Sequence, residues 1–214
     1  MKKYIEVLEF KPTQFAVGLL EVHTKVKEIE KLKKSKRKKL VDEHPIPVII
    51  SPHNEYFLVD HHHLLFAFWS VGIKEAKIEV LHDLSEKKMS FSQFWRWMKK
   101  RGYFYPYCQF GEGPRHPLYL PLDIRGVADD PYRSLAWFVR QEGAYENTQE
   151  NFAEFTWANF YREKKLLDHH GKKGMEHALE RAVKLAKSKE AKRLPGYIER
   201  KTVKESAKTD TKKK

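Results

Sequence analysis

The sequence has a single cysteine and no long apolar run. Cys108 alone cannot form a disulfide within the chain, which is typical of a protein kept in a reducing compartment. No window approaches the roughly 18 uninterrupted apolar residues that a transmembrane helix needs. No amino-terminal stretch joins a basic start to a long apolar run, as a secretory signal would. These absences exclude a membrane-spanning protein, and we expect a cytoplasmic protein that has no membrane partner.

What the sequence does contain suits one compact domain with a tail. The chain has 214 residues, of which 41% are hydrophobic and 13% are aromatic. A chain of this length and composition can bury a sizeable core. The composition leaves the oligomeric state open.

The net charge of +13 comes from two stretches of the chain. Residues 25–39 carry nine basic and two acidic side chains, and residues 172–214 carry 15 basic and six acidic ones. We expect the lysine run of residues 31–39 to be a helix end or an exposed loop. Such runs are usually solvated surface, but they also attract nucleotide or nucleic-acid phosphates in a salt-dependent way. The sequence leaves both interpretations open.

The amino-terminal part of the chain predicts a small mixed sheet flanked by helices, which is an α+β fold. The expected strands cover residues 4–10, 48–50, 56–59 and 76–81. Apolar residues recur at three- and four-residue spacing from Phe15 to Ile29, so we expect a helix there with Thr13 as its cap. A second helix is expected over residues 64–71, closed by Gly72 in the left-handed conformation.

The rest of the chain predicts helices. We expect residues 1–85 to form the sheet domain, residues 86–170 to form an aromatic-rich helical extension packed on it as one unit, and residues 171–214 to form a basic helix and a disordered tail. Aromatic residues at helical spacing are most often core, whereas residues 103–107 read as an exposed loop whose rings could stack on a base.

The sequence Asp60-His61-His62-His63 lies at the turn between a predicted strand and a predicted helix. The first turn of a helix presents backbone N–H groups without acceptors and a partial positive charge, so it suits a phosphate group. Imidazoles titrate near neutral pH and can act there as an acid, a base or a donor to phosphoryl oxygens. The turn therefore predicts a phosphate-handling site.

Two other interpretations of the histidines stay open. Metal ligands on a helix converge at a spacing of four residues, whereas these follow one another directly, so at most two of them could share an ion. Asp60 or a distant histidine would then complete the set, and the distant candidates are His23, His44 and His82. Alternatively, one or two of the three histidines are satisfied helix-cap residues and another faces solvent.

A second candidate lies further along the chain. Asp130 and Pro131 are typical of a helix start, with Asp130 as the cap and Pro131 at the first helical position. Arg133 follows within one turn in an otherwise apolar helix. It either supplies a phosphate-binding arginine or forms a buried ion pair with a nearby aspartate.

Several short motifs together resemble the ParB/sulfiredoxin superfamily, and more closely its branch of ParB-like nucleases. The resemblance covers roughly residues 4–165. The motifs are Lys11-Pro12-Thr13-Gln14, Val17-Gly18, Glu21-Val22, Pro45-Ile46-Pro47-Val48, Val59-Asp60-His61-His62-His63 and Asp130-Pro131-Tyr132-Arg133-Ser134-Leu135-Ala136.

The resemblance implies a nucleotide at the strand-turn-helix. In this superfamily, partition proteins hold CTP there, sulfiredoxins hold ATP, and a free-serine kinase holds ADP on an Asp-Gly-His-His-Arg turn. In this chain His61 replaces the glycine and Leu64 replaces the arginine, while Gln14 stands where the kinase has its carboxylate base. Glu21 could substitute for that base only if its helix points it inward.

We therefore expect a ParB-like protein that binds nucleotide or nucleic-acid phosphates, in the first place a phosphodiesterase or nuclease. The alternatives are a nucleotide-dependent small-molecule kinase and a DNA-binding protein without catalysis. The expected cofactors are Mg²⁺, held by Asp60, and a nucleotide (ATP, ADP or CTP). The expected catalytic residues are Asp60, His61, His62, His63 and Glu21. The expected phosphate-binding residues are His62, His63, Lys25, Arg133 and Gln14.

Overall fold

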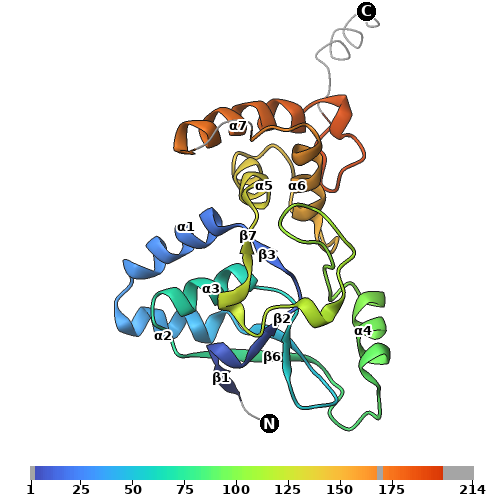
Figure 1. Cartoon of the computed structure of the whole chain (residues 1–214). Coiled ribbons are helices and arrows are strands. Elements are labelled where there is room, and N and C mark those ends of the chain that lie inside the picture. The colour runs from blue at the N-terminus through green and yellow to red at the C-terminus, as the bar shows by residue number, and fades with distance from the viewer. Residues whose placement is uncertain (1–2, 168–170, 200–214) are drawn as a thin grey trace, which may run out of the picture.

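The computed structural model describes residues 3–167 and 171–199 (Figure 1). A five-stranded sheet with three helices forms the amino-terminal part, and four further helices follow it. The strands are β1 (Tyr4–Glu6), β2 (Phe10–Pro12), β3 (Ala16–Val17), β4 (Ile46–Ile50), β5 (Tyr56–Leu58), β6 (Glu75–Asp83) and β7 (Ala128–Asp129). The α-helices are α1 (Leu19–Glu30), α2 (Lys34–Glu43), α3 (His62–Ser70), α4 (Phe91–Lys100), α5 (Pro131–Gln141), α6 (Ala153–Glu163) and α7 (Gly171–Ala186).

Strand β4 forms the centre of the sheet, whose order is β1-β6-β4-β5-β2. All five of its residues are buried, as expected of a strand that is covered on both faces. It pairs antiparallel with β5 and parallel with β6, with a bulge between Val48 and Ile49. The predicted strands in this region and the left-handed Gly72 (φ 76°) are confirmed.

The predicted single strand over residues 4–10 is wrong. Strands β1 and β2 lie at opposite edges of the sheet, and only the short 3₁₀ helix Val7–Glu9 separates them in sequence. Three residues of 3₁₀ helix advance the chain by only ~6 Å. The sheet must therefore curl until its two edges come close together.

Helix α1 begins later than predicted, with Gly18 rather than Thr13 at its cap. The Thr13 hydroxyl instead donates to the carbonyl oxygen of Leu58 at 2.6 Å, which fastens β2 to β5. Phe15 belongs to a different apolar cluster from the one that α1 packs on. The chain between them forms β3, which pairs in parallel with β7, a strand that comes after α4 in the sequence.

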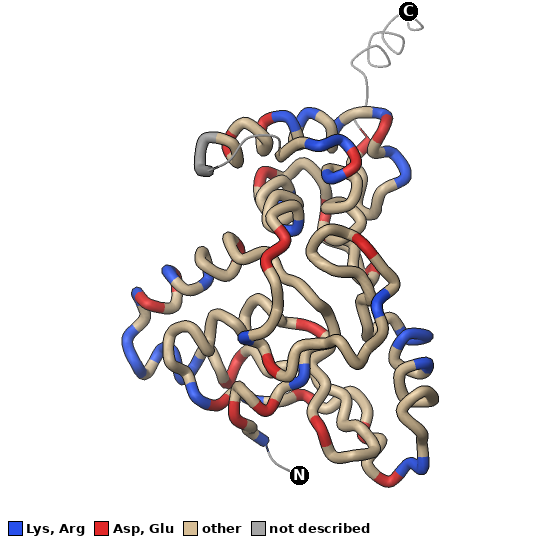
Figure 2. Tube along the Cα trace, in the orientation of Figure 1, with Lys and Arg blue, Asp and Glu red and all other residues tan. Residues whose placement is uncertain are grey.

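Residues 34–39 of the lysine run lie in a helix of their own, whereas Lys31 ends α1 and residues 32–33 form the expected loop. Helix α2 begins at Lys34, and Val41 is its one fully buried residue among exposed basic side chains. The turn from α1 into α2 makes a basic corner at one side of the molecule (Figure 2). We call residues 31–39 the basic corner.

Helices α5, α6 and α7 share an apolar cluster of their own, whereas α4 packs on sheet residues such as Ile49 and Phe57. Helix α7 contributes three fully buried alanines at four-residue spacing, Ala178, Ala182 and Ala186, and contacts α5 (Figure 1). The helix predicted in the basic terminal stretch is thus present and packed, and the predicted tail over residues 200–214 lies outside the described residues. Within residues 3–167 and 171–199, no helix has the length and apolar character needed to cross a bilayer.

Candidate functional site

The turn between β5 and α3 puts a histidine in a backbone conformation that glycine favours. His61 has φ 66° and serves as the cap residue of α3. It occupies the place where the related kinase turn has glycine. The His61 amide donates to Asp60 Oδ1 at 2.6 Å. The first turn of α3 leaves the amides of residues 62–64 without helical acceptors, so they are available to an anion.

His62 and His63 are buried, and each accepts a backbone amide. Nε2 of His62 accepts from the Thr13 N–H at 3.3 Å, and Nε2 of His63 accepts from the Gly18 N–H at 3.0 Å. An accepting Nε2 carries no proton, so Nδ1 carries it in both rings. Burial lowers the pKa of His62 to about 3 and holds the pKa of His63 well below its usual value. Both imidazoles are therefore neutral donors near pH 7.

Glu21 points inward, as a role at the site requires. Its side chain is buried in the first turn of α1, and its Oε2 lies 3.1 Å from Nη1 of Arg133. Lys25 Nζ lies 3.6 Å from the other carboxylate oxygen. Glu21 Oε2 is also 3.4 Å from Nε2 of His63, but this contact is no ion pair because that imidazole is neutral. Glu21 is thus held by two cations beside the histidines.

Arg133 joins the sheet domain to the helices that follow it. It is 7% exposed and pairs with Glu21 of α1 and with Glu154 of α6. The predicted buried ion pair therefore exists, but with glutamates rather than with an aspartate. Asp130 instead caps α5 and binds Arg162 at 2.6 Å. Among the described residues Nε of Arg133 has no hydrogen-bond partner.

Sequence reasoning missed Glu154 and Arg140. Nη2 of Arg140 lies 2.7 Å from Oε1 of Glu154, so this carboxylate bridges two arginines. Arg133 and Arg140 are seven residues apart and therefore share one face of α5. Two basic residues on one face of an otherwise apolar helix predict an acidic partner packed against that face. They do not tell which acidic residue of the sequence it is.

Two hollows meet at this cluster. The first hollow, of about 410 Å³, and the second hollow, of about 640 Å³, share one wall. Of the expected site residues, Gln14 and His62 line the first hollow alone, and Glu21, Lys25 and His61 line the second alone. The shared wall consists of Asp60, His63, Arg133, Asn147 and Glu154. All the residues proposed from the sequence therefore gather around this wall.

Asp60 lies at the mouth of both hollows and is exposed. Desolvation raises its pKa, but hydrogen bonding and charge from His61 outweigh this and lower the pKa to about 2. It is therefore ionised at any physiological pH. Among the described residues no three His, Cys, Asp or Glu side chains are grouped to hold a metal ion. A Mg²⁺ ion here would depend on Asp60, water and the phosphates of a substrate.

The three distant histidines that were considered as metal ligands beside Asp60 are either exposed or make other contacts. His82 packs edge-on against Trp97 with ring centroids 5.1 Å apart. His44 lines the second hollow, and its Nδ1 lies 3.0 Å from the Leu40 carbonyl oxygen. His23 is exposed on α1.

The two basic stretches differ in their relation to the hollows. The second hollow is lined by Leu32 and Leu40, which lie at the two ends of the lysine run, so the basic corner adjoins it. No described residue of α7 lines either hollow. Only the first stretch is therefore placed to attract a substrate into the cluster.

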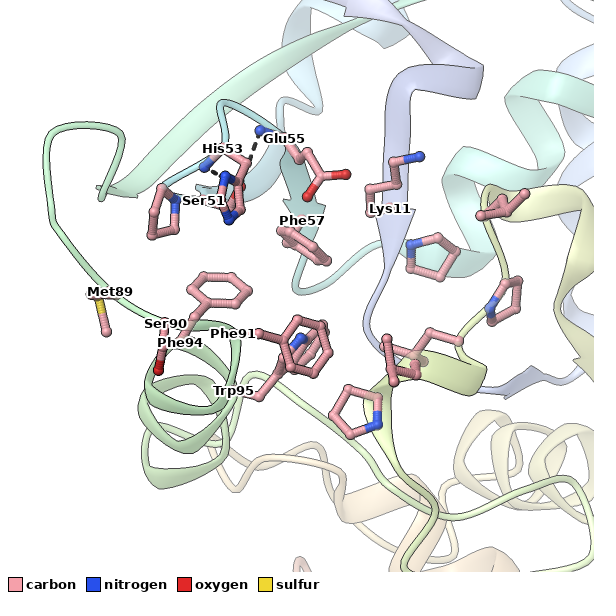
Figure 3. Close-up of a pocket in the computed structure, with 17 residues that line it drawn as sticks. Lys11, Ser51, His53, Glu55, Phe57, Met89, Ser90, Phe91, Phe94 and Trp95 are labelled. Atoms are coloured by element: carbon pink, nitrogen blue, oxygen red, sulfur yellow. Dashed lines mark hydrogen bonds between the residues drawn. The ribbon is translucent and has the colours of Figure 1, made fainter.

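A further hollow is of a different kind (Figure 3). It has a volume of about 220 Å³ and an apolar floor that includes Phe57, Phe94 and Trp95, with Lys11 and Glu55 at its edge. Small-molecule sites commonly measure about 300–1,000 Å³. This hollow contains none of the residues predicted from the sequence, so we do not assign the phosphate site to it.

Comparisons with known proteins agree with this architecture. A family model described as "Putative ParB-like nuclease" matches residues 3–163, which include α3 and Arg133. The crystal structure of protein Atu1540 from Agrobacterium tumefaciens is 33% identical in sequence, with a TM-score of 0.82. The similarity covers 92% of this chain and 96% of that one. A search of curated proteins gave no match. The ParB-like fold expected from the sequence is confirmed.

Proposed function

Because the chain belongs to the ParB-like nuclease family, we propose that it binds nucleotide or nucleic-acid phosphates at the α3 turn and hydrolyses a phosphodiester bond. The observation that carries this proposal is the meeting of two kinds of donor at one place. The first-turn amides of α3 and the buried guanidinium of Arg133, with its unpartnered Nε, belong to the same cluster. Amides and a guanidinium are the groups that bind phosphate oxygens most strongly.

The neutral imidazoles fit the binding of an anion. His62 and His63 hold the loop before α1 through Nε2, and this leaves Nδ1–H as the donor of each ring. Their low pKa values make them poor proton-transfer groups near pH 7. We therefore assign them to binding and positioning.

Glu21 is the residue that we propose as general base. Its carboxylate lines the second hollow and is oriented there by Arg133 and Lys25. In the proposed reaction a water molecule gives a proton to Glu21 and its oxygen bonds to phosphorus. The bond from phosphorus to the leaving oxygen then breaks, and that oxygen takes up a proton from a second water molecule. Glu21 returns its proton to the hydroxide that remains, which restores the carboxylate. Mg²⁺ at Asp60 would neutralise charge on the phosphate.

The proposed substrate is a nucleic-acid strand, because the basic corner adjoins the second hollow. Lysines outside the reacting site would neutralise phosphates along the strand and give binding a steep dependence on salt. The same lysines have no evident part in binding a free mononucleotide.

Hydrolysis of labelled single-stranded oligonucleotides with and without Mg²⁺ tests the proposal. Glu21→Gln should abolish cleavage and keep binding, and Asp60→Asn should weaken the response to Mg²⁺. Glu28→Gln is the matched control, because Glu28 is an exposed acid on the same helix that lines the same hollow. Equal activity of Glu21→Gln and Glu28→Gln would refute the proposed base, and binding without cleavage in every condition would indicate a DNA-binding protein.

A kinase is the second candidate, favoured by the two hollows that share a wall. One hollow could hold a nucleotide while the other holds the acceptor, with the transferred phosphoryl group at the wall. Such an enzyme would release ADP from ATP only when an acceptor is supplied. Cleavage of oligonucleotides without any acceptor would argue against it.

A further inference from the structure

We propose that the first hollow contains a nucleobase subsite, built from Tyr103 and from residues 147–149, which all line it. This inference rests on the proposed function, because it takes the α3 end of the same hollow as the phosphate site. The ligand class is then a nucleotide whose base and phosphate lie in one hollow. Neither Tyr103 nor this loop belongs to the sheet domain.

Tyr103 presents a fixed aromatic ring. It follows α4 and is half-buried. Its hydroxyl lies 3.4 Å from Nε2 of His82, and its ring packs against Trp97 with centroids 6.0 Å apart. Phe104 and Tyr105 next to it are buried, contrary to the exposed loop expected over residues 103–107. Tyr103 is thus the one ring of this segment that lines the first hollow.

The lining of the first hollow is also rich in side chains that donate and accept hydrogen bonds. Asn147, Thr148, Gln149 and Asn151 all line the hollow within one short loop between α5 and α6. Carboxamides pair with the edges of bases, and the bidentate pairing with adenine is the best known. A hollow that is lined by amides and by an aromatic ring is suited to hold a base by stacking and by its edge.

The loop is fastened to the segment that leads into Tyr103. Asn151 Nδ2 donates to the carbonyl oxygen of Arg101 at 3.4 Å. Gly102 has φ +70°, and a Cβ atom there would lie 2.2 Å from the same Nδ2. Asn151 therefore serves as the link, and the exposed Asn147 and Gln149 are the amides available to a ligand.

The same hollow also carries the groups for an anion. His62, His63 and Arg133 line it, and the two histidines belong to the first turn of α3. Its volume of about 410 Å³ falls within the range of about 300–1,000 Å³ that is common for small-molecule sites. A hollow of this size with an aromatic ring and anion-binding groups fits a ligand that has one planar and one anionic part. A nucleotide has both, whereas inorganic phosphate and a sugar phosphate lack the planar part.

Calorimetric titration with AMP, ribose 5-phosphate and inorganic phosphate tests the subsite. The wild-type chain should bind AMP at least tenfold more tightly than ribose 5-phosphate, because stacking adds affinity only when a base is present. Tyr103→Leu, and separately Gln149→Ala, should reduce the affinity for AMP about 5- to 100-fold and leave the affinity for ribose 5-phosphate unchanged.

Matched controls separate these effects from general damage. Tyr119→Leu removes a ring that is 75% exposed and lines neither this hollow nor the second one, and Gln141→Ala removes an exposed amide at the end of α5. Both should bind AMP as the wild type does.

The outcomes distinguish the subsite from the function on which it rests. Equal affinity of the wild type for AMP and ribose 5-phosphate would overturn the base subsite and leave phosphate binding intact. A loss of both affinities in Tyr103→Leu would make Tyr103 merely structural and would likewise overturn it. Failure of all three ligands to bind the wild type would overturn the proposed function as well.

Discussion

Nε2 of His63 accepts the amide N–H of Gly18 at 3.0 Å, so the first turn of α3 is bonded directly to the cap of α1. His62 makes the equivalent bond to Thr13. The two histidines thus tie the turn at the start of α3 to the loop that precedes α1. Both bonds need an unprotonated ring, and this requirement makes the site sensitive to acid.

We predict that stability falls as the pH is lowered from about 6.5. In the fold the pKa of His62 is about 3 and that of His63 is also lowered, whereas the unfolded chain takes up these protons near pH 6.5. The unfolded state then binds more protons, so the free energy of unfolding decreases by about 1.4 kcal/mol per pH unit for each ring below that pH. Above about pH 6.5 the contribution is fully present.

Urea unfolding at pH 7, 6 and 5 measures this dependence. His62→Gln keeps an acceptor for the Thr13 amide but does not titrate, so its stability should change about half as steeply between pH 6 and 5. Protonation of Asp60 lowers the free energy of unfolding only below about pH 4, because its pKa in the fold is lowered to about 2. An unchanged slope in His62→Gln would show that His62 is not the titrating group.

We predict that His61→Gly stabilises the chain. A side chain at φ 66° costs roughly 1–2 kcal/mol, and the extra freedom of glycine in the unfolded state offsets part of this. The net gain in the free energy of unfolding should be about 0.5–1 kcal/mol by chemical denaturation. Gly72→Ala is the reciprocal control, because Gly72 has φ 76° with open space around it, and it should lose about 1 kcal/mol. A loss of stability in His61→Gly would show that the imidazole contributes more than its backbone costs.

We predict that Arg133→Met strongly destabilises the chain and abolishes phosphate binding. It would leave the carboxylates of Glu21 and Glu154 without their shared cation in a largely buried place, and such a loss costs about 3–5 kcal/mol. Arg125→Met is the control, because Arg125 is half-exposed and its loss still leaves Asp123 with a backbone N–H donor, so it should cost about 1 kcal/mol or less. Similar losses in the two variants, measured by urea unfolding, would contradict this account of the cluster.

We predict that the basic corner supplies most of the non-specific attraction for nucleic acid. Lys36→Glu with Lys38→Glu should weaken oligonucleotide binding and make its dependence on salt shallower, by about one unit of slope per lost phosphate contact. Lys184→Glu with Lys187→Glu makes the same change in charge near the end of α7, away from both hollows. Fluorescence anisotropy at several salt concentrations compares them. Equal effects of the two double variants would show that binding depends on the total charge of the protein rather than on the basic corner.

The local part of the site could be predicted from the sequence, because neighbours in the chain build it. Apolar patterning predicts the strand before Asp60 and the turn and helix after it. The helical spacing, in contrast, left open whether Glu21 points inward. The pairing of Arg133 with Glu21 joins residues 112 positions apart, so the sequence could suggest a buried partner but could not identify it. Likewise, β3 exists only because β7 supplies its pairing partner.

The errors in the fold have related causes. Residues 4–10 alternate as one strand would, but the curl of the sheet divides them between its two edges. The apolar Phe15 fits the helical spacing by coincidence, since it packs in another cluster. The lysine run lacks the apolar periodicity of a buried helix, and its helix is held mainly by Val41.

Arg133 comes from one half of the chain and Glu21 from the other. If the sheet domain and the later helices were produced as separate fragments, neither should retain phosphate. Recovery of binding on mixing would then report their reassembly, so the ligand itself could serve as a probe for complementation between fragments.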